Sequence, residues 1–249
     1  MHMAGKVAVV TGAARGLGRR LAERIVEAGG RVVLGDVLDE QGAAAAAALN
    51  AGRAAPVAVY QHCDVTRSSE LAALVARAEA EFGALDIMVN NAGIAGMPLW
   101  ADEDGAAAAR TIAINLAAPV EGTRLAVAHF RRAGRPGCVV NTASMMAFFP
   151  TEFGPVYGAT KSALVNLTAA CAPLAQRDPP IRVNAVAPNY ADTDMAQGLV
   201  AAAAGLLTVD EVVDQMVRCI EDESLAGDTI KIVPGRPPRI HDGRKAPKL

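Results

Sequence analysis

The pair Tyr157 and Lys161 is the strongest candidate for acid–base chemistry in this chain of 249 residues. The two residues stand four positions apart in a stretch of helical character, so their side chains lie on one face of one helix. A free phenol has a pKa of about 10 and is a poor base at neutral pH, but a nearby ammonium group stabilises phenolate. Tyr60 and Tyr190 each have an aspartate at the fourth position instead. We therefore expect Lys161 to lower the pKa of Tyr157.

Ser144 stands 13 residues before Tyr157, just after a short apolar run that is typical of a strand. From there its hydroxyl could hold a substrate oxygen beside the phenol. Taken alone, such a serine also fits a helix or turn cap, and the Tyr157–Lys161 pair also fits an exposed helix face. Together the three residues predict proton transfer to or from a substrate oxygen.

A glycine-rich turn follows the first apolar run of the chain. Residues 11–18 read TGAARGLG and lead directly into a segment with helical periodicity, with Gly12, Gly16 and Gly18 where chain reversal and close approach of a pyrophosphate are needed. The phosphates would rest on the helix N-terminus, whose free N–H groups and dipole attract an anion. A tight strand-to-helix turn without a ligand is the alternative.

Asp36 ends the second apolar run, 18 residues beyond Gly18. A carboxylate there can accept hydrogen bonds from the ribose hydroxyls of an adenosine and would repel a 2′-phosphate. This favours NAD over NADP, although Arg15 in the glycine turn partly offsets the charge. An ordinary aspartate at a strand end is the alternative.

Short apolar runs alternate with longer stretches whose apolar residues recur three and four positions apart. The runs lack polar alternation, as is typical of strands buried on both faces of a parallel sheet. We predict a single-domain α/β protein with a Rossmann-like, doubly wound parallel sheet of about seven strands and helices on both faces. The predicted strands are Lys6 to Val10, Arg31 to Asp36, Val57 to Gln61, Leu85 to Asn90, Gly137 to Thr142, Ile181 to Val186 and Thr229 to Val233.

Polar residues follow the third and fourth predicted strands, as Asp64-Val65 and as the run Asn90 to Gly93. Ligands of open parallel sheets bind at the carboxyl ends of strands, so these positions line the predicted crevice. Plain turns are the alternative. We assign residues 4–233 to one Rossmann domain and residues 234–249 to an irregular, basic, proline-rich tail, which is either a mobile terminus or a cover over a partner subunit.

The chain resembles the short-chain dehydrogenase/reductase family, of the NAD-preferring type, over about residues 5–233. The motifs that carry the resemblance are the TGxxxGxG turn at residues 11–18, the NNAG run at residues 90–93, and the set Ser144, Tyr157 and Lys161. The resemblance implies that Asn115 is the fourth catalytic residue and helps to hold a water on a proton path from Lys161. It also implies that Tyr157 takes the alcohol proton while hydride leaves for nicotinamide.

The same resemblance implies an NAD site, in which Asp64 and Val65 bind adenine and Lys161 contacts the nicotinamide ribose. The implied cofactor-binding residues are Gly12, Arg15, Gly16, Leu17, Gly18, Asp36, Asp64, Val65, Asn91, Ala92, Gly93, Tyr157, Lys161, Pro188 and Thr193. No metal site is predicted.

The chain departs from the family's pattern in two places. Asn189 stands after Pro188 where a glycine is usual, and because asparagine tolerates a left-handed backbone we expect the turn to survive. The family's common C-terminal ending, which often supports tetramers, is absent. We expect a homodimer or homotetramer, with a dimer through the two long helices that carry Asn115 and Tyr157 as our hypothesis.

Apolar side chains are expected to line the substrate pocket. The predicted pocket residues are Ile94, Trp100, Met146, Phe149, Tyr190 and Met195, with Met97, Leu99, Met145, Phe148 and Leu199 as further candidates. Such a pocket derives affinity from buried apolar area and favours a hydrophobic secondary alcohol or ketone, such as a steroid, a terpenoid or an acyl chain. Core or dimer contacts are the alternative for several of these residues.

Composition argues against other classes. A net charge of -2 gives no basic excess for a nucleic-acid partner, and no apolar run reaches the roughly 18 residues of a membrane span. The four cysteines are far apart and form no CxxC pair, which makes a reducing cytoplasm the simplest location.

Three alternatives remain at this point. An NADPH-dependent carbonyl reductase is opposed by Asp36 and favoured by Arg15. A non-catalytic dinucleotide-sensing protein is opposed by the presence of the whole catalytic set. An isomerase or dehydratase on the same fold would keep the cofactor without net redox change.

Overall fold

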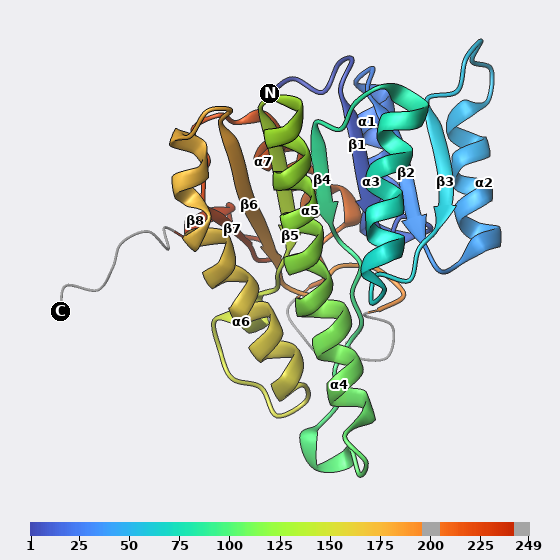
Figure 1. Cartoon of the computed structure of the whole chain (residues 1–249). Helices are drawn as coiled ribbons and strands as arrows, with labels where there is room; N and C mark the ends of the chain where they lie inside the picture. Colours follow the sequence, from blue (N-terminus) through green and yellow to red (C-terminus); the bar gives the residue numbers. More distant parts are fainter. Residues whose placement is uncertain (196–204, 242–249) are drawn as a thin grey trace.

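The computed structural model describes residues 1–195 and 205–241. Within these ranges the strands are β1 (Val7–Thr11), β2 (Arg31–Asp36), β3 (Ala58–His62), β4 (Ile87–Asn90), β5 (Gly137–Thr142), β6 (Ile181–Pro188), β7 (Thr229–Ile232) and β8 (Arg239–His241). They form one sheet in the order β3-β2-β1-β4-β5-β6-β7-β8 (Figure 1). Each neighbouring pair is parallel except β7 and β8. The predicted α/β class and doubly wound parallel sheet are confirmed.

Helices connect the strands and cover both faces of the sheet. In the described part of the chain the α-helices are α1 (Gly16–Glu27), α2 (Asp39–Asn50), α3 (Ser68–Phe82), α4 (Ala106–Ile112), α5 (Ala118–Ala133), α6 (Pro155–Ala170) and α7 (Val209–Glu221). Shorter helical pieces are the 3₁₀ segments η1 (Leu99–Ala101), η3 (Met145–Ala147) and η4 (Ala172–Gln176) and the π-helical segment η2 (Ala113–Ala117). None of the described helices is long and apolar enough to cross a membrane.

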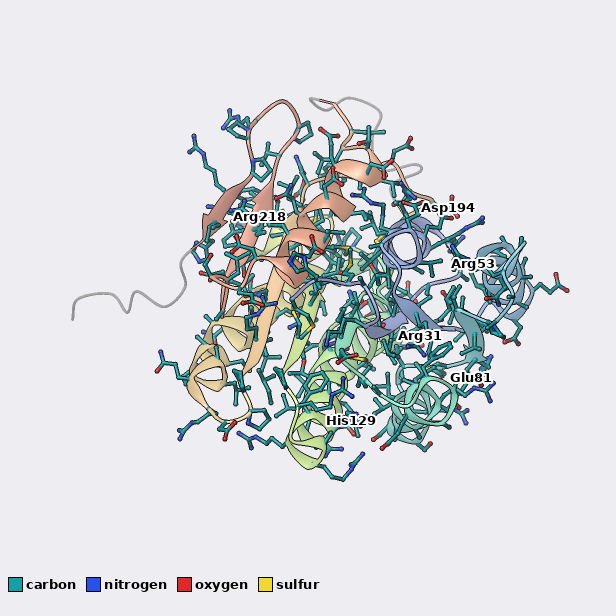
Figure 2. The ribbon with its side chains drawn as sticks, turned by 90° about the horizontal axis from the view of Figure 1, so that it is seen from above. Arg31, Arg53, Glu81, His129, Asp194 and Arg218 are labelled. Atoms are coloured by element: carbon teal, nitrogen blue, oxygen red, sulfur yellow. The ribbon has the colours of Figure 1, made fainter. Side chains whose placement is uncertain are left out.

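The core lies on both faces of the sheet, because side chains of the central strands are buried on either side. Leu21 and Ile25 of α1 and Met216 of α7 pack on one face together with α2. Leu74 of α3 and Phe130 of α5 pack on the other face, where α6 adds a smaller cluster. Seen from above, these two helical layers enclose the sheet, with α1 and α7 on one side and α3, α5 and α6 on the other (Figure 2).

The order of the strands reverses between β1 and β4, since β2 and β3 lie on one side of this pair and β5 to β8 on the other. At such a point the connections leave in opposite directions and a crevice opens at the carboxyl ends of the strands. The Asn91 amide, just after β4, donates to the carbonyl groups of Thr11 (3.0 Å) and Gly12 (3.1 Å), just after β1. The two strand ends are therefore tied together where a ligand would bind.

The C-terminal segment departs from the prediction. Residues 234–249 were expected to be irregular, but Arg239–His241 form β8, which pairs with β7 through Ile230 and Ile240. The strand is short, exposed and basic, as edge strands often are, so it lacks the apolar run that predicted the others. The sheet of the domain therefore extends beyond residue 233, and residues 242–249 lie outside the described ranges.

Candidate active site

Helix α6 places Tyr157 and Lys161 on one face. The helix begins at Pro155, whose fixed φ suits a first helical position, and Tyr157 lies in its first turn. The Lys161 ammonium lies 5.5 Å from the centre of the Tyr157 ring and donates a hydrogen bond of 2.6 Å to the Thr142 carbonyl at the end of β5. The lysine is thus held against the tyrosine by the strand beneath the helix.

Burial governs the protonation of this pair. It raises the pKa of Tyr157 above its ordinary value, and hydrogen bonding with Ser144 acts in the opposite direction. Burial also lowers the pKa of Lys161 to about 8, because the side chain is only 4 % exposed and an ammonium group loses its hydration there. The pKa of Tyr157 is therefore raised overall, whereas a lowered pKa was expected, because desolvation of the phenol outweighs its hydrogen bond with Ser144.

Ser144 follows β5, and the structure shows the cap role that the sequence left open. Its hydroxyl oxygen accepts the Met146 N–H at 3.2 Å and caps η3, and the hydroxyl donates to the Pro188 carbonyl at 3.5 Å. Its hydrogen bonding with Tyr157 places the serine beside the phenol. Both groups can therefore reach one substrate oxygen.

Asn115 is fully buried in the π-helical turn η2. Its side-chain oxygen accepts the Ile94 N–H and its amide nitrogen donates to the Ile94 carbonyl, both at 2.9 Å. A Cβ added to Gly93 would lie 3.3 Å from the Asn115 oxygen and 3.7 Å from the Lys161 ammonium. The structure therefore brings Asn115 and Lys161 to the same side of Gly93, and Asn115 fixes the loop after β4.

The glycine turn forms a cradle that suits a pyrophosphate. A Cβ at Gly18 would lie 2.2 Å from the Gly12 carbonyl oxygen, and one at Gly12 would lie 2.8 Å from the Ala92 Cα, so neither position has room for a side chain. The first turn of α1 has no side-chain cap and no acidic residue. Its N–H groups are therefore available to an anion. This fits the nucleotide that the motif implies, while Leu17 packs against the core behind the turn.

Asp36 lies at the end of β2 beside the glycine turn. Its carboxylate accepts the N–H groups of Ala14 (2.9 Å), Val37 (2.8 Å) and Leu38 (3.2 Å). A carboxylate offers about four acceptor positions, so capacity remains for a ribose hydroxyl. The Arg15 guanidinium points elsewhere and pairs with Asp194 at 2.7 Å.

The remaining cofactor candidates lie at the predicted strand ends. The Thr11 hydroxyl oxygen accepts the N–H groups of Asn91 and Ala92, each at 3.1 Å. Asp64 accepts hydrogen bonds from the Thr66 N–H and hydroxyl, which lower the pKa of its carboxyl group. Val65 is buried in the core beneath α3, so its side chain is mainly a packing residue.

The turn after β6 brings Thr193 to the glycine turn, where its methyl group would lie 3.6 Å from a Cβ on Gly16. Asn189 follows Pro188 and donates its N–H to the Ile232 carbonyl at 2.9 Å, which extends the pairing of β6 with β7. In the described ranges only glycines have a positive φ. The turn therefore survives without the left-handed backbone that was expected of Asn189.

The predicted pocket residues separate into two groups. Ile94, Met146 and Tyr190 are half-buried, whereas Trp100 (71 % exposed), Phe149 (54 %) and Met195 (44 %) are open to solvent, as are Met97 and Leu99. Two further candidates are packing residues. Met145 is buried, and Phe148 packs beneath α6, with Lys231 5.1 Å above its ring and His241 4.8 Å away. Leu199 lies outside the described residues.

Sequence reasoning missed several residues that shape the site. Thr142 binds Lys161 through its backbone carbonyl, and a role of that kind leaves no trace in residue type. Gly96 supports Tyr157, because a Cβ there would lie 2.8 Å from the Tyr157 Cβ. Phe153 is 65 % exposed in the loop before α6. The aromatic side chain of Phe153, four residues after Phe149, was the feature of the sequence that could have identified it.

Comparison with known proteins gives a family match over most of the chain. Residues 6–204 match the family model described as short chain dehydrogenase. The chain is 38 % identical to cis-4-hydroxycyclohexanecarboxylate dehydrogenase of Sinomonas cyclohexanicum, with 86 % of this chain and 85 % of the relative covered. It is 30 % identical to the NAD(+) 15-hydroxyprostaglandin dehydrogenase of Homo sapiens over 93 % of this chain and 92 % of the relative.

A solved structure shows the same architecture. The short-chain dehydrogenase/reductase structure from Brucella melitensis, titled glucose/ribitol dehydrogenase, superimposes with a TM-score of 0.83 at 27 % identity. The match covers 94 % of this chain and 97 % of that one.

Proposed function

Because the chain belongs to the short-chain dehydrogenase family, we propose that it transfers hydride between NAD(H) and a secondary alcohol or ketone, with Tyr157 as acid and base. The observation that carries the proposal is the meeting of Tyr157, Ser144 and Lys161 at the carboxyl end of the sheet. Beside them lies a helix N-terminus that no side chain caps. A nicotinamide dinucleotide held by the glycine turn and Asp36 would supply or accept the hydride.

The chain's own residues handle the proton. In ketone reduction the neutral Tyr157 phenol donates its proton to the carbonyl oxygen as that oxygen gains negative charge. Ser144 donates a second hydrogen bond to the same oxygen. In alcohol oxidation the Tyr157 phenolate takes the alcohol proton and becomes a neutral phenol, and the positive charge of Lys161 stabilises the phenolate before this transfer. As the family resemblance implies, Asn115 would help to hold a water on the path from Lys161 to solvent.

Two observations support NAD as the cofactor. Asp36 places negative charge where a 2′-phosphate would lie, and Arg15, the residue that could offset it, is paired with Asp194. A relative at 30 % identity is named as an NAD(+) enzyme. The substrate we propose is hydrophobic, of steroid, terpenoid or acyl-chain type, because the side chains around the site are apolar and exposed.

Calorimetric titration with NADH and NADPH tests the cofactor. We expect at least about tenfold preference for NADH, since a hydrogen bond to a charged group contributes about 1.5–3 kcal/mol. In Asp36→Asn this preference should disappear. Because Asp36 also accepts the Ala14 N–H, the variant needs a control for the glycine turn. Retained binding of NADPH by the variant shows that the turn is intact. Wild-type preference for NADPH would favour the carbonyl-reductase alternative instead.

Turnover of a panel of hydrophobic secondary alcohols tests the chemistry. Tyr157→Phe should bind NADH as the wild type does and lose at least about a hundredfold in kcat, the usual contribution of a positioned acid–base group. A variant as active as the wild type would contradict the assignment of Tyr157. Binding of NADH without turnover of any alcohol or ketone would favour the dinucleotide-sensing alternative.

We further propose that the protein forms a homodimer through α5 and α6. The outer side of the α4–α5 run exposes Ile112 (46 %) and Val120 (42 %).

Location in the cytoplasm is supported by the four free cysteines, none of which forms a disulfide among the described residues.

A further inference from the structure

Three loops converge on Tyr157 and form the entrance to the proposed site. We call them the site loops: residues 91–105 after β4, residues 143–154 after β5, and the described residues 189–195 and 205–208 after β6. Gly96 and Gly154 both pack against the Tyr157 Cβ, and Tyr190 raises the pKa of the phenol. Figure 1 shows the three connections at the same end of the sheet.

The charges of the site loops all have one sign. The three segments contain no Lys, Arg or His, although the whole chain has 24 basic and 26 acidic residues. Their acidic residues are Asp102, Glu103, Asp104, Glu152, Asp192 and Asp194. Because acidic and basic residues are almost equally common in this chain, an even mixture would be expected in these loops.

Half of these carboxylates have no polar partner in the described part of the chain. Asp102 and Asp104 accept N–H groups at the start of α4, and Asp194 pairs with Arg15. The carboxylates of Glu103, Glu152 and Asp192 are exposed. Within the described part of the chain, each of these three side chains has neither a hydrogen bond nor an ion pair. One such charge therefore stands on each site loop.

Basic groups near the site are occupied elsewhere. Arg15 is held by Asp194 at 2.7 Å, and Lys161 is buried and donates to the Thr142 carbonyl. Lys231 lies over the ring of Phe148, which packs beneath α6. None of these three cations is placed to pair with an anionic group entering between the loops.

The same loops present the largest exposed apolar side chains of the entrance. Trp100 is 71 % exposed and Phe153 is 65 % exposed, on different loops, and Met195 is 44 % exposed on the third. A substrate that enters meets apolar surface for binding and negative charge around it. This combination attracts apolar groups and repels anions.

We propose that the site selects uncharged hydrophobic alcohols and ketones and excludes those that carry a carboxylate. This inference rests on the proposed function and names its substrate class. It separates the chain from the 38 % identical relative that is named a hydroxycyclohexanecarboxylate dehydrogenase. Discrimination arises from repulsion of the wrong substrate as well as attraction of the right one.

Trp100 gives a test of the electrostatics that needs no turnover, because it is the one tryptophan of the chain. We expect caesium to quench its fluorescence more strongly than iodide, relative to neutral acrylamide, at low ionic strength. In the triple variant Glu103→Gln, Glu152→Gln, Asp192→Asn the difference should shrink, and salt should shrink it in the wild type. Equal quenching by the two ions in the wild type would overturn the proposal.

The matched control removes the same charge from the opposite end of the molecule, with Glu27→Gln, Glu79→Gln and Glu81→Gln. These residues lie near the C-terminal ends of α1 and α3, and Figure 2 labels Glu81 on α3. The control should quench as the wild type does. An equal effect of the control would show that net charge alone is responsible, which would also overturn the proposal.

Kinetics with matched acids and esters then test the selection itself. We expect kcat/KM for the methyl esters of cis-4-hydroxycyclohexanecarboxylate and 3-hydroxybutanoate to exceed that of the free acids at least about tenfold at low salt, within the range of electrostatic steering. The triple variant should have a higher kcat/KM for the acids and an unchanged kcat/KM for the esters. Acids used as well as esters would overturn the proposal. Turnover of no alcohol at all, with the expected quenching, would instead overturn the proposed function.

Discussion

Burial, more than neighbouring charge, sets the protonation of Tyr157 and Lys161, the proposed catalytic pair. The phenol of Tyr157 has a raised pKa and therefore stays protonated, whereas the pKa of Lys161 falls to about 8. The two groups are in contact, so the pair loses its first proton with an apparent pKa that belongs to both. Alcohol oxidation needs that proton to have left, while ketone reduction needs it present.

We therefore expect kcat for alcohol oxidation, at saturating NAD, to rise as the pH increases through about 8, and kcat for reduction to fall over the same range. Lys161→Met removes the positive charge that stabilises the Tyr157 phenolate. The rise should then move above the usual tyrosine value of about 10. Stopped-flow pH profiles measure this shift. Lys231→Met, which removes a lysine that contacts Phe148 instead, should keep the wild-type profile. A Lys161→Met profile with the wild-type midpoint would refute the coupling.

The sequence predicted which residues meet but not how deeply they are buried. The four-residue spacing of Tyr157 and Lys161 places them on one helical face whatever surrounds that face. The pKa direction depends instead on Thr142 and on the loops that carry Gly96 and Gly154, which pack around the pair. These contacts join distant parts of the chain and involve backbone atoms, which residue type does not reveal.

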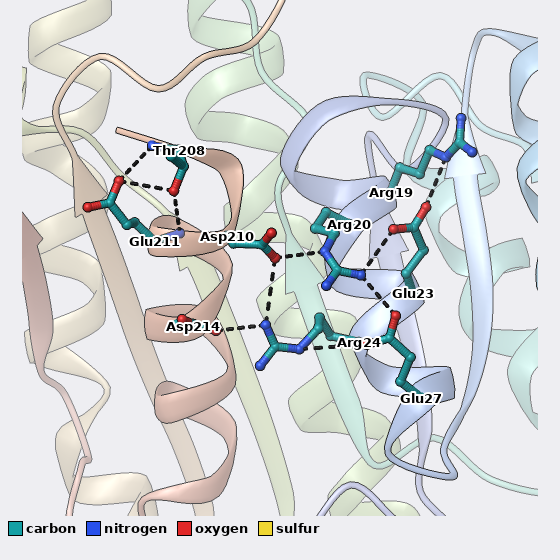
Figure 3. Close-up of polar contacts among 9 residues, drawn as sticks. All are labelled: Arg19, Arg20, Glu23, Arg24, Glu27, Thr208, Asp210, Glu211 and Asp214. Carbon is teal, nitrogen blue, oxygen red and sulfur yellow. Dashed lines mark hydrogen bonds and ion pairs between the residues drawn. The ribbon is translucent and has the colours of Figure 1, made fainter. Parts of the chain in front are cut away.

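At the scale of elements, side chains of other elements bind α7 near its start and at its end. This helix follows the loop that carries Tyr190 and Met195. Near its start, Arg20 and Arg24 of α1 bind Asp210 and Asp214 of α7, each at 2.7 Å (Figure 3). At its end, the buried Arg182 of β6 donates to the carbonyl groups of Cys219, Ile220, Asp222 and Leu225. The helix is thus held to a neighbouring helix and to the sheet.

The two sets of contacts should contribute differently to the free energy of unfolding. Arg182→Met leaves several buried carbonyl groups without a donor and should lower the free energy of unfolding by about 3 kcal/mol. Arg24→Met should cost less than about 1 kcal/mol, because its carboxylate partner is more than half exposed. Urea denaturation of both variants measures the difference. Equal losses of unfolding free energy in the two variants would show that Arg182 does not satisfy the carbonyl groups at the end of α7.

The seven strands with continuous apolar runs were predictable, because burial on both faces demands such runs. The strand β8 was not, since Arg239, Ile240 and His241 form no apolar run and their pairing depends on the neighbouring edge of β7. The packing of Phe148 against His241 and Lys231 was hidden for the same reason. The sequence therefore predicted Phe148 as a pocket residue, whereas in the structure it packs against His241 and Lys231.

At the scale of the whole molecule, the outer surfaces of the two helical layers differ. The outer side of α1 and α7 carries a network of arginine and carboxylate side chains, which is well suited to solvent (Figure 3). On the other layer Ile112 and Val120 are exposed eight residues apart along the α4–α5 run. We propose that these two exposed apolar side chains belong to a contact surface for a second copy of the chain.

The proposed dimer places this run against its symmetry mate, so one introduced charge would appear twice in the interface. We expect sedimentation velocity to give a dimer for the wild type and a monomer for Val120→Glu. Ile240→Glu is the matched control, because Ile240 is 43 % exposed, close to the 42 % of Val120, but lies on β8 at the edge of the sheet. It should remain a dimer. A wild-type monomer or tetramer, or dissociation by Ile240→Glu alone, would place the contact elsewhere, because only an interface through α5 loses its packing when Val120 becomes charged.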